Sequence, residues 1–282
     1  MQEYEGQEDD WSQIIQDEAC SYVNHEIRRL QVAGVDGNDD GKNFITVACV
    51  THLSPLDMMD LSWGTQDATG NRVWMGALLL IESLQSLKVY LESRHVLELG
   101  CGTGIAGLAV AQVFRPQRII LTDNSEAALD LCRRNLLLNT SIAEEDVVKI
   151  NQLEWGGDGV ASSCWKESLD TVLATDVLYD LGSLLPLLMT ASGLLVPGGH
   201  FILSHVPRAS LPPSCSFDNL EAYIVHQAKD FGLELDSILQ PKALPHSQHM
   251  NELSLEEMHE TGAAILIFTK QTINNECVIG QR

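Results

Sequence analysis

The sequence predicts a doubly wound α/β fold built on a seven-stranded sheet, and three observations carry this prediction. Short apolar segments alternate regularly with helical segments from about residue 76 onward, a pattern typical of parallel strands joined by helices. The last two apolar segments have no helix between them, so one of these strands is expected to run antiparallel or to sit apart. At 282 residues and 45% hydrophobic composition, the chain can bury a sizeable core.

The segments before this alternation are more varied. Residues 1–42 contain eleven acidic residues against Arg28, Arg29 and Lys42, and we interpret them as an acidic N-terminal extension. Within it, residues 11–30 could form one amphipathic helix. After it we expect a strand at 43–50, a hairpin at 61–74 with its turn at Thr69-Gly70-Asn71, and a helix at 76–92.

The alternating part of the chain is divided by its apolar runs and its turn residues. Each apolar run is short enough for a strand, and each intervening segment has helical length. We expect strands at 95–99, 118–122, 146–150, 169–176, 200–206, 233–239 and 262–270, and helices at 105–114, 125–139, 181–195 and 217–232.

The net charge of the chain indicates which classes of macromolecule are expected as binding partners. The chain has 39 acidic and 17 basic residues, for a net charge of -22. Such a surface repels phosphate backbones and anionic lipid, so we expect no nucleic-acid and no membrane partner. A basic protein or peptide is a more natural macromolecular partner. The alternative is that the charge only keeps the protein in solution.

The cysteines and the apolar segments indicate a soluble intracellular protein, cytoplasmic or nuclear, which we expect to be a monomer. The seven cysteines are odd in number and contain no C-x-x-C pair, which argues against a disulfide framework or a zinc site. The acidic start of the chain is unlike a signal peptide. The longest apolar helix candidate ends at Pro197, before it could span a bilayer. His246, His249 and His259 lack an H-E-x-x-H pattern, so no metal is expected.

The stretch "VLELGCGTG" at 96–104 ends a predicted strand on closely spaced glycines. Residues 102–107, "GTGIAG", formally satisfy the dinucleotide pattern G-x-G-x-x-G. Glu98 would repel a pyrophosphate but would attract a cationic ligand such as S-adenosylmethionine (AdoMet). No G-K-[ST] follows, which disfavours a triphosphate. A tight turn without a ligand is the remaining alternative.

Asp123 ends the second predicted strand, nineteen residues beyond Gly104. A carboxylate in this position can accept hydrogen bonds from both hydroxyls of a ribose. NAD and AdoMet both carry that ribose, so Asp123 indicates an adenosyl ligand without choosing between them. The alternative role is the N-cap of the next helix, which Asn124 or Ser125 could supply equally well.

Five motifs in order now suggest a family: "RVWMGALLL", "VLELGCGTGIAGL", "LTDN", "LEWG" and "ATDVLYD". Over about residues 60–210 the chain resembles the seven-β-strand protein lysine methyltransferases of methyltransferase family 16. The resemblance implies a Rossmann-like class I methyltransferase sheet that uses AdoMet. We therefore expect this domain at 43–270, followed by a C-terminal tail at 271–282.

The resemblance also implies the site residues. Trp74 would border the cofactor, Asp123 would bind the ribose, and Trp155 would lie beside the adenine. Asp176 and Tyr179 match a D-x-x-Y element at the methyl-transfer site and are the expected catalytic residues. The chain departs from the family pattern at Glu154, where aspartate is commoner, and in the acidic extension. The expected cofactor-binding residues are Trp74, Glu98, Gly100, Cys101, Gly102, Gly104, Asp123, Asn124, Trp155 and Thr175.

These residue types suit transfer of a methyl group to a lysine. The reaction is an in-line displacement, so positioning is the main task, and the lysine must lose a proton against a pKa of about 10.4. Asp176 can orient the amine, and the Tyr179 ring tolerates a developing methylammonium by cation–π attraction. The alternative is structural: Asp176 would cap the next helix, and Tyr179 would pack under it.

Other functions remain open at this point. A protein histidine or a small molecule could be the methyl acceptor, or the chain could be a catalytically silent AdoMet-binding protein. His205 and Arg208 follow the fifth strand and could line the substrate entrance, or they could be ordinary loop residues.

Overall fold

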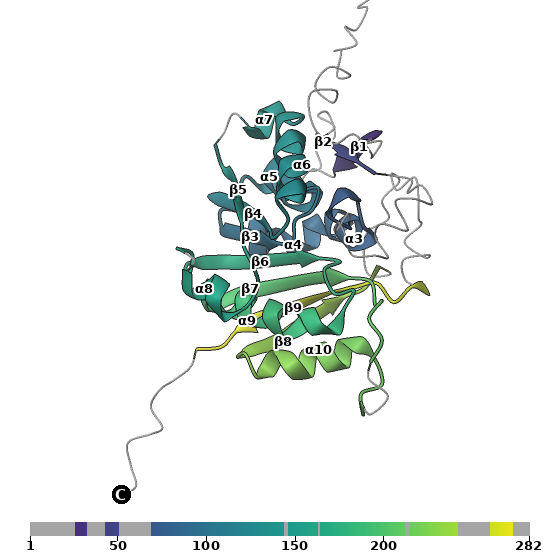
Figure 1. Cartoon of the computed structure of the whole chain (residues 1–282), viewed down its shortest axis with the longest axis vertical. Helices are drawn as coiled ribbons and strands as arrows, with labels where there is room; N and C mark the ends of the chain where they lie inside the picture. Colours follow the sequence, from purple (N-terminus) through teal and green to yellow (C-terminus); the bar gives the residue numbers. More distant parts are fainter. Residues whose placement is uncertain are drawn as a thin grey trace, which may run out of the picture.

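A computed structural model describes residues 26–32, 43–50, 69–143, 146–162, 164–211, 215–241 and 260–272, and these contain the expected seven-stranded sheet (Figure 1). The strand order is β5-β4-β3-β6-β7-β9-β8. The strands are β3 (His95–Leu99), β4 (Arg118–Asp123), β5 (Val148–Gln152), β6 (Leu169–Thr175), β7 (Leu195–His205), β8 (Leu233–Leu239) and β9 (Ala264–Lys270).

The direction of the strands confirms the doubly wound fold and resolves the question of the reversed strand. The strands from β5 to β7 pair in parallel. β9 runs antiparallel to both of its neighbours, β7 and β8. The reversed strand is therefore the last one of the described chain, and it is inserted between two strands that precede it in sequence.

Helices cover both faces of the sheet, which is why central strands such as β3 are buried on both sides. On one face α3, α4, α5, α6 and α7 share a core with side chains such as Val96 and Leu173. On the other, α9 and α10 pack on Leu97, Val172 and Ala174, with α8 against α9. The helices are α3 (Met75–Glu82), α4 (Leu84–Leu91), α5 (Ile105–Phe114), α6 (Glu126–Leu137), α7 (Thr140–Ala143), α8 (Gly157–Ser162), α9 (Leu184–Leu194) and α10 (Leu220–Lys229).

A separate two-stranded sheet corrects the expected N-terminal helix. β1 (Glu26–Val32) pairs antiparallel with β2 (Asn43–Cys49), so the helix expected at 11–30 is wrong over residues 26–30. The rest of that prediction lies outside the described residues. The cause is tertiary pairing, because β2 supplies a ladder of backbone partners that overrides the helical spacing of the segment.

Two asparagines, Asn135 on α6 and Asn139 just after that helix, hold β2 against the main domain. Asn139 accepts from the Thr46 N–H (2.9 Å) and donates to its carbonyl (2.8 Å). Asn135 does the same with Ala48, at 2.7 and 3.2 Å. Asn135 also donates to the carbonyl of Thr103 (2.9 Å) in the glycine loop. The asparagines thus connect β2 to the loop that follows β3.

Two further local expectations are corrected. The described end of the expected hairpin, residues 69–74, forms the 3₁₀ turn η1 (Thr69–Asn71) and the approach to α3, not a strand; residues 61–68 lie outside the described part. The helix expected at 76–92 is two helices that meet at Ser83. The Ser83 hydroxyl donates to the carbonyl of Leu79, four residues back, at 2.6 Å, a bond associated with bent helices.

Candidate active site

A cavity of about 470 Å³ lies where β3, β4 and β6 end. The strand order reverses at β3, and open α/β sheets bind ligands at this position, outside the carboxyl ends of the strands. The volume falls within the range of about 300–1,000 Å³ for cofactor and ligand pockets. The expected site residues that line it are Trp74, Gly100, Cys101, Gly102, Asp123, Asn124, Trp155, Thr175, Asp176 and Tyr179. Glu98 and Gly104 are not among its lining residues.

The glycine loop is a backbone wall of this cavity. Gly100, Gly102 and Gly104 all have positive φ, of 68°, 50° and 77°, a region that other residues avoid. A Cβ on Gly102 would lie 2.9 Å from the carbonyl oxygen of Gly70, so the loop passes close to η1. A Cβ on Gly104 would lie 2.5 Å from the Sγ of Cys132 on α6. Gly102 therefore shapes the cavity, whereas Gly104 allows the loop to pack on α6.

Glu98 is withdrawn from the cavity. Its side chain is fully buried, and its carboxyl group accepts from the Gly107 N–H (2.9 Å) and the Thr175 hydroxyl (3.5 Å). Burial raises the pKa of Glu98 to about 8, which the hydrogen bonds to Gly107 and Thr175 only partly oppose. Glu98 is therefore predominantly protonated at neutral pH, and it supports the loop and the start of α5 instead of presenting a negative charge to a ligand.

Asp123 lies at the opposite side of the loop and lines the cavity. Its carboxylate accepts from the backbone N–H groups of Gly102 and Ser125, each at 3.0 Å. The N-cap of α6 is Ser125, whose hydroxyl accepts from the Ala128 N–H at 3.4 Å. The capping alternative for Asp123 is thus wrong, and its carboxylate is oriented by the glycine loop.

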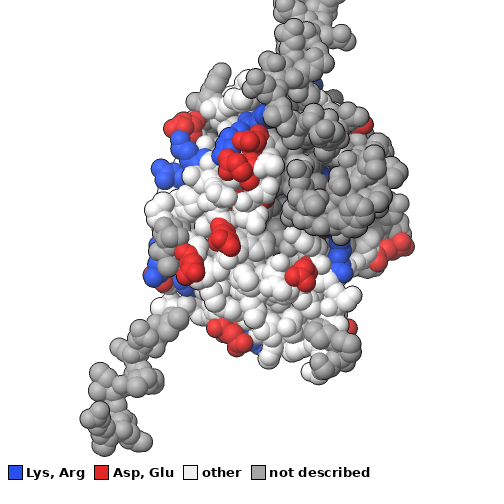
Figure 2. Space-filling model, in the orientation of Figure 1, with Lys and Arg blue, Asp and Glu red and all other residues white. Residues whose placement is uncertain are grey.

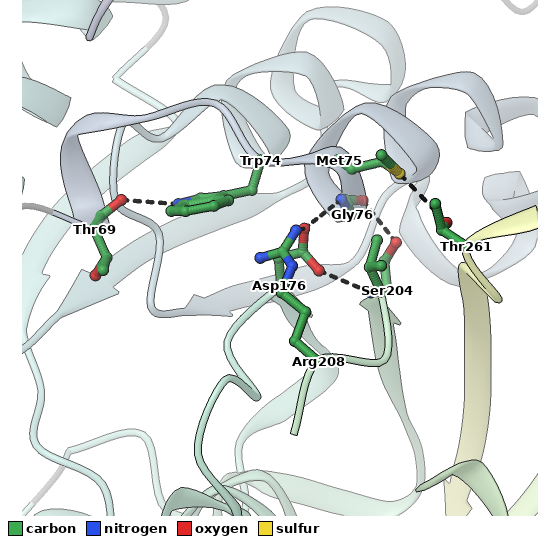
Figure 3. A network of polar contacts seen from close by, with 9 residues as sticks. Thr69, Trp74, Met75, Gly76, Asp176, Ser204, Arg208 and Thr261 are labelled. Carbon is green, nitrogen blue, oxygen red and sulfur yellow. Dashed lines mark hydrogen bonds and ion pairs between the residues drawn. The ribbon is translucent and has the colours of Figure 1, made fainter. Parts of the chain in front are cut away.

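Asp176 dominates the other end of the cavity. Its side chain is 1% exposed, and its φ of 55° turns the chain sharply after β6. Oδ2 accepts from the Gly76 N–H (2.7 Å) and from Arg208 Nη2 (3.0 Å) (Figure 3). Oδ1 accepts from the Val206 N–H (2.8 Å). Asp176 therefore caps α3, a helix one hundred residues earlier, and not the helix that follows it.

Gly76 lies between Asp176 and β7, and the space there is too small for a side chain. The Ser204 hydroxyl donates to the Gly76 carbonyl at 2.6 Å, so both polar groups of this residue are held (Figure 3). A Cβ on Gly76 would lie 2.8 Å from both Asp176 Cγ and the Ser204 carbonyl oxygen. The first turn of α3 thus determines where the carboxylate of Asp176 lies.

Aromatic and cationic side chains line the cavity together with this carboxylate. Trp74 Nε1 donates to the Thr69 carbonyl at 2.8 Å, and the guanidinium of Arg208 lies 4.7 Å from the centre of the Trp74 ring (Figure 3). Arg72 lies over the same ring at 5.1 Å. Tyr179 is 55% exposed at the cavity, so the alternative that it packs under a helix is wrong.

The structure separates Arg208 from His205, which is the last residue of β7 and does not follow the strand. Arg208 lines the cavity, whereas His205 is 1% exposed and does not. Neither ring nitrogen of His205 has a hydrogen-bond partner among the described residues. Burial, and to a lesser degree the charge of Arg208, lower the pKa of His205 to about 4, so this ring is neutral at physiological pH.

Several lining residues were not among the expected site residues. Thr69, Gly70 and Arg72 come from η1 and the residue after it, where the sequence predicted a hairpin, and Ser183 precedes α9. Within the described ranges no group of three metal-ligating side chains occurs and no helix is long and apolar enough to cross a membrane. The three histidines considered for a metal, at 246, 249 and 259, lie outside those ranges.

Comparison with known proteins adds a family match. A model of the lysine methyltransferase family matches residues 55–213. Protein-lysine N-methyltransferase EFM3 of Chaetomium thermophilum is 29% identical over 163 residues, 56% of this chain and 48% of that protein. Human protein-lysine N-methyltransferase EEF2KMT is 35% identical over 127 residues, 42% of this chain and 37% of that protein.

A further curated relative and one solved structure also match this chain. Mouse methyltransferase-like protein 22 is 31% identical over 126 residues, 39% of this chain and 32% of that protein. Among solved structures, a methyltransferase from Pyrococcus furiosus has a TM-score of 0.46 at 19% identity, over 68% of this chain and 83% of that one. This chain spans less than half the length of each of the three curated relatives.

Proposed function

Because this chain belongs to the lysine methyltransferase family, we propose that it transfers a methyl group from AdoMet to the side-chain nitrogen of a lysine in a protein substrate. The observation that supports this best is one cavity of about 470 Å³ that joins the glycine loop to Asp176 and Tyr179. A cofactor bound at the loop and an acceptor beside Asp176 would share that cavity, as a direct group transfer requires.

The residues at the loop fit AdoMet. Gly100 and Gly102 allow a ligand to approach the backbone, and Asp123, already oriented by Gly102, faces the cavity where a ribose would lie. A Cβ on Gly100 would lie 3.2 Å from the Trp155 ring, so this ring borders the loop and is available to stack on an adenine. When bound, AdoMet would supply an electrophilic methyl group, whose bond to sulfur breaks as the lone pair of the amine forms the new N–C bond.

The acceptor end would position a neutral amine. Asp176 offers a hydrogen-bond acceptor, and Tyr179 offers a ring face and a hydroxyl group at the entrance. Among the described residues that line the cavity there is no histidine or lysine to act as a base, so the chain's contribution is orientation and the proton leaves to solvent. A partly buried pocket assists this, since desolvation disfavours the ammonium form.

We also propose that the protein substrate is basic and that nucleic acid is not a target, because the net charge of -22 attracts the former and repels the latter. On the face shown in Figure 2, the described acidic side chains form several separate groups. Long-range attraction to the whole molecule is therefore a better account of steering than one acidic docking patch.

The test uses purified protein and AdoMet labelled on its methyl group, incubated with a dialysed cell extract. We expect label that is sensitive to protease, resistant to nuclease and recovered as methyl-lysine after hydrolysis. A Tyr179→Phe variant keeps the ring and should retain more transfer than Asp176→Asn. Label recovered as methylhistidine, in RNA or in a small molecule would contradict the proposed acceptor.

A binding measurement tests the cofactor separately. AdoMet, and not NAD, should raise the melting temperature, since a ligand at one hundred times its Kd stabilises the folded state by about 2.7 kcal/mol. Binding without any transfer would favour a catalytically silent AdoMet-binding protein. Stabilisation by NAD alone would overturn the cofactor assignment.

A further inference from the structure

The acceptor end of the cavity contains a positive charge whose position the proposed chemistry does not by itself require. Arg208 Nη2 lies 3.0 Å from Asp176 Oδ2, and the Arg208 side chain is 33% exposed against 1% for Asp176. The guanidinium also lies over the Trp74 ring at 4.7 Å. A cation in this place would be expected to repel a protonated lysine, so its presence in a lysine-accepting site needs a reason.

The contacts of Asp176 supply that reason. Its carboxylate accepts from two backbone N–H groups, those of Gly76 and Val206, and from Arg208. An ionised carboxyl group has about four acceptor positions, so the three donors leave room for one more hydrogen bond. Its negative charge is balanced by Arg208 at contact distance. The pair therefore offers an acceptor atom to an incoming amine without a net negative charge.

We propose that Arg208 is a positioning residue that keeps the Asp176 end of the cavity electrically neutral, so that the site favours the neutral amine of the acceptor lysine over its ammonium form. This inference rests on the proposed function. An unpaired carboxylate would instead stabilise the ammonium, which has no lone pair to attack a methyl group. An opposite charge within about 4–6 Å shifts a pKa by about 1–3 units in favour of the charged form.

Other charged groups nearby do not replace Arg208. α3 packs on Asp176 through Gly76, and its titratable residue, Glu82, lies at its far end. His205 is neutral above its pKa of about 4. Glu98, behind Thr175, titrates near its pKa of about 8, but it does so in wild type and variants alike. The remaining titratable residues that line the cavity are Arg72, Cys101, Asp123, Glu154 and Tyr179.

The test is the pH dependence of lysine methylation. The probe is the protein fraction of a cell extract, freed of small molecules, and the readout is the initial rate of methyl-lysine formation between about pH 6.5 and about pH 9.5 at saturating AdoMet. Arg208→Met removes the charge but retains an apolar side chain beside Trp74. Arg208→Lys retains the charge but loses the planar fork. Arg72→Met removes the other cation near Trp74, which does not contact Asp176.

Arg208→Met should move the rising limb of the pH–rate profile to higher pH by about one unit or more. Its rate at pH 7 should therefore be about tenfold lower than that of wild type, and the two rates should become similar near the alkaline end of the range. Its apparent KM for the acceptor should fall or stay constant, because the ammonium form now binds. For Arg208→Lys the rising limb should lie at the same pH as in wild type, and the maximal rate should be lower. Arg72→Met should shift the limb less than Arg208→Met.

Three outcomes would overturn the inference. A rate for Arg208→Met that is reduced by the same factor at every pH would assign Arg208 a structural role only. An equal shift for Arg208→Lys would mean that its charge is not what matters. If wild type forms no methyl-lysine at any pH, the proposed function itself fails. Binding of AdoMet by each variant, measured by calorimetry, shows whether a loss of rate arises at the cofactor end instead.

Discussion

The two ends of the cavity are built in different ways. The proposed cofactor end is mostly local: residues 100–104 turn on three glycines after β3, and the Asp123 carboxylate from the adjacent strand accepts from the Gly102 N–H. The proposed acceptor end is assembled from distant parts of the chain, since Asp176 contacts Gly76, Val206 and Arg208. The structure of the cofactor end depends on backbone conformation, whereas the structure of the acceptor end depends on hydrogen bonds and charge.

This difference predicts that the two ends can be damaged separately. A change at the glycine loop should abolish cofactor binding, and a change near Asp176 should reduce transfer while cofactor binding persists.

The largest effect is expected from Gly102→Val. The new side chain would occupy a φ of 50° and approach the Gly70 carbonyl, which lies 2.9 Å from the Cβ position. A left-handed conformation costs a residue with a Cβ about 1–2 kcal/mol before any clash, so the affinity for AdoMet should fall by about a hundredfold or more. Calorimetry with AdoMet measures this.

Gly198→Ala is the matched control, because Gly198 also has a positive φ (79°) but no atom lies within 4 Å of its Cβ position. It should lower the melting temperature and leave the affinity for AdoMet unchanged. Equal losses of affinity in both variants would mean that the loop acts only through the stability of the fold.

Gly76→Ala should damage the acceptor end alone. Its methyl group would lie 2.8 Å from Asp176 Cγ, and the carboxylate would have to move away from Val206 and Arg208. We expect kcat for lysine methylation to fall about tenfold or more, since a small misplacement of a positioning group has a large cost. The Kd for AdoMet should change by less than about threefold, under 1 kcal/mol.

The control for Gly76→Ala is Gly157→Ala on α8, where the atom nearest the Cβ position is Met189 Sδ at 3.5 Å, an ordinary contact. This variant should retain wild-type kcat. If Gly76→Ala weakened AdoMet binding as strongly as it reduced transfer, the two ends would not be separable.

Glu98→Gln tests whether a negative charge on Glu98 contributes to the binding of AdoMet at the glycine-loop end of the cavity. The pKa of Glu98 is raised from 4.5 to about 8, so Gln imitates its protonated form, and the affinity for AdoMet at pH 7 should stay within about threefold of wild type. Between about pH 4.5 and about pH 8 the folded state holds a proton that the unfolded state has lost, so the free energy of unfolding of wild type falls as pH rises.

The melting temperature of Glu98→Gln should therefore improve relative to wild type as pH is raised from about 5 to about 8. Thermal unfolding at several pH values measures the difference. A difference that stays constant with pH would mean that Glu98 is ionised in the folded protein.

The smallest effect is expected from His205→Leu, which lies close to the acceptor end but outside the cavity. The pKa of His205 is lowered from 6.5 to about 4, so the unfolded state takes up a proton first as the pH falls, and wild type loses stability between about pH 6.5 and about pH 4. His205→Leu has no imidazole to take up a proton, so it does not lose stability in this way. Its melting temperature relative to wild type should rise as pH is lowered from about 7 to about 5; an unchanged difference would show that the pKa of His205 is the same in the folded and unfolded states.

The fold was largely predictable from the alternation of apolar segments, and the errors have a common cause. The reversed strand was expected among the last two, but its identity as β9 depends on which strand lies next to β7. Residues 26–30 were expected to be helical and instead pair with β2. In both cases the deciding partner lies outside the segment itself, and the spacing of residues within the segment contains no information about it.

The same distinction holds for the site. The places of Gly102 and Asp123 at the cavity were predictable because each follows from a strand, a turn and a helix in direct succession. The withdrawal of Glu98 from the cavity was not, because it results from the packing of α5 through Gly107. Asp176 was expected at the site, but its contacts with Gly76 and Arg208 were not, since they form only when α3 and the end of β7 meet.

The insertion of β9 between β7 and β8 has a consequence for synthesis on the ribosome. β7 and β8 are complete at residues 205 and 239, yet the strand that joins them ends at Lys270. Until that segment is synthesised, β7 has an unpaired edge next to the acceptor end of the cavity, which is a template for aggregation. We therefore expect nascent chains that stall before residue 264 to depend on chaperones, although their glycine loop and Asp176 are already present.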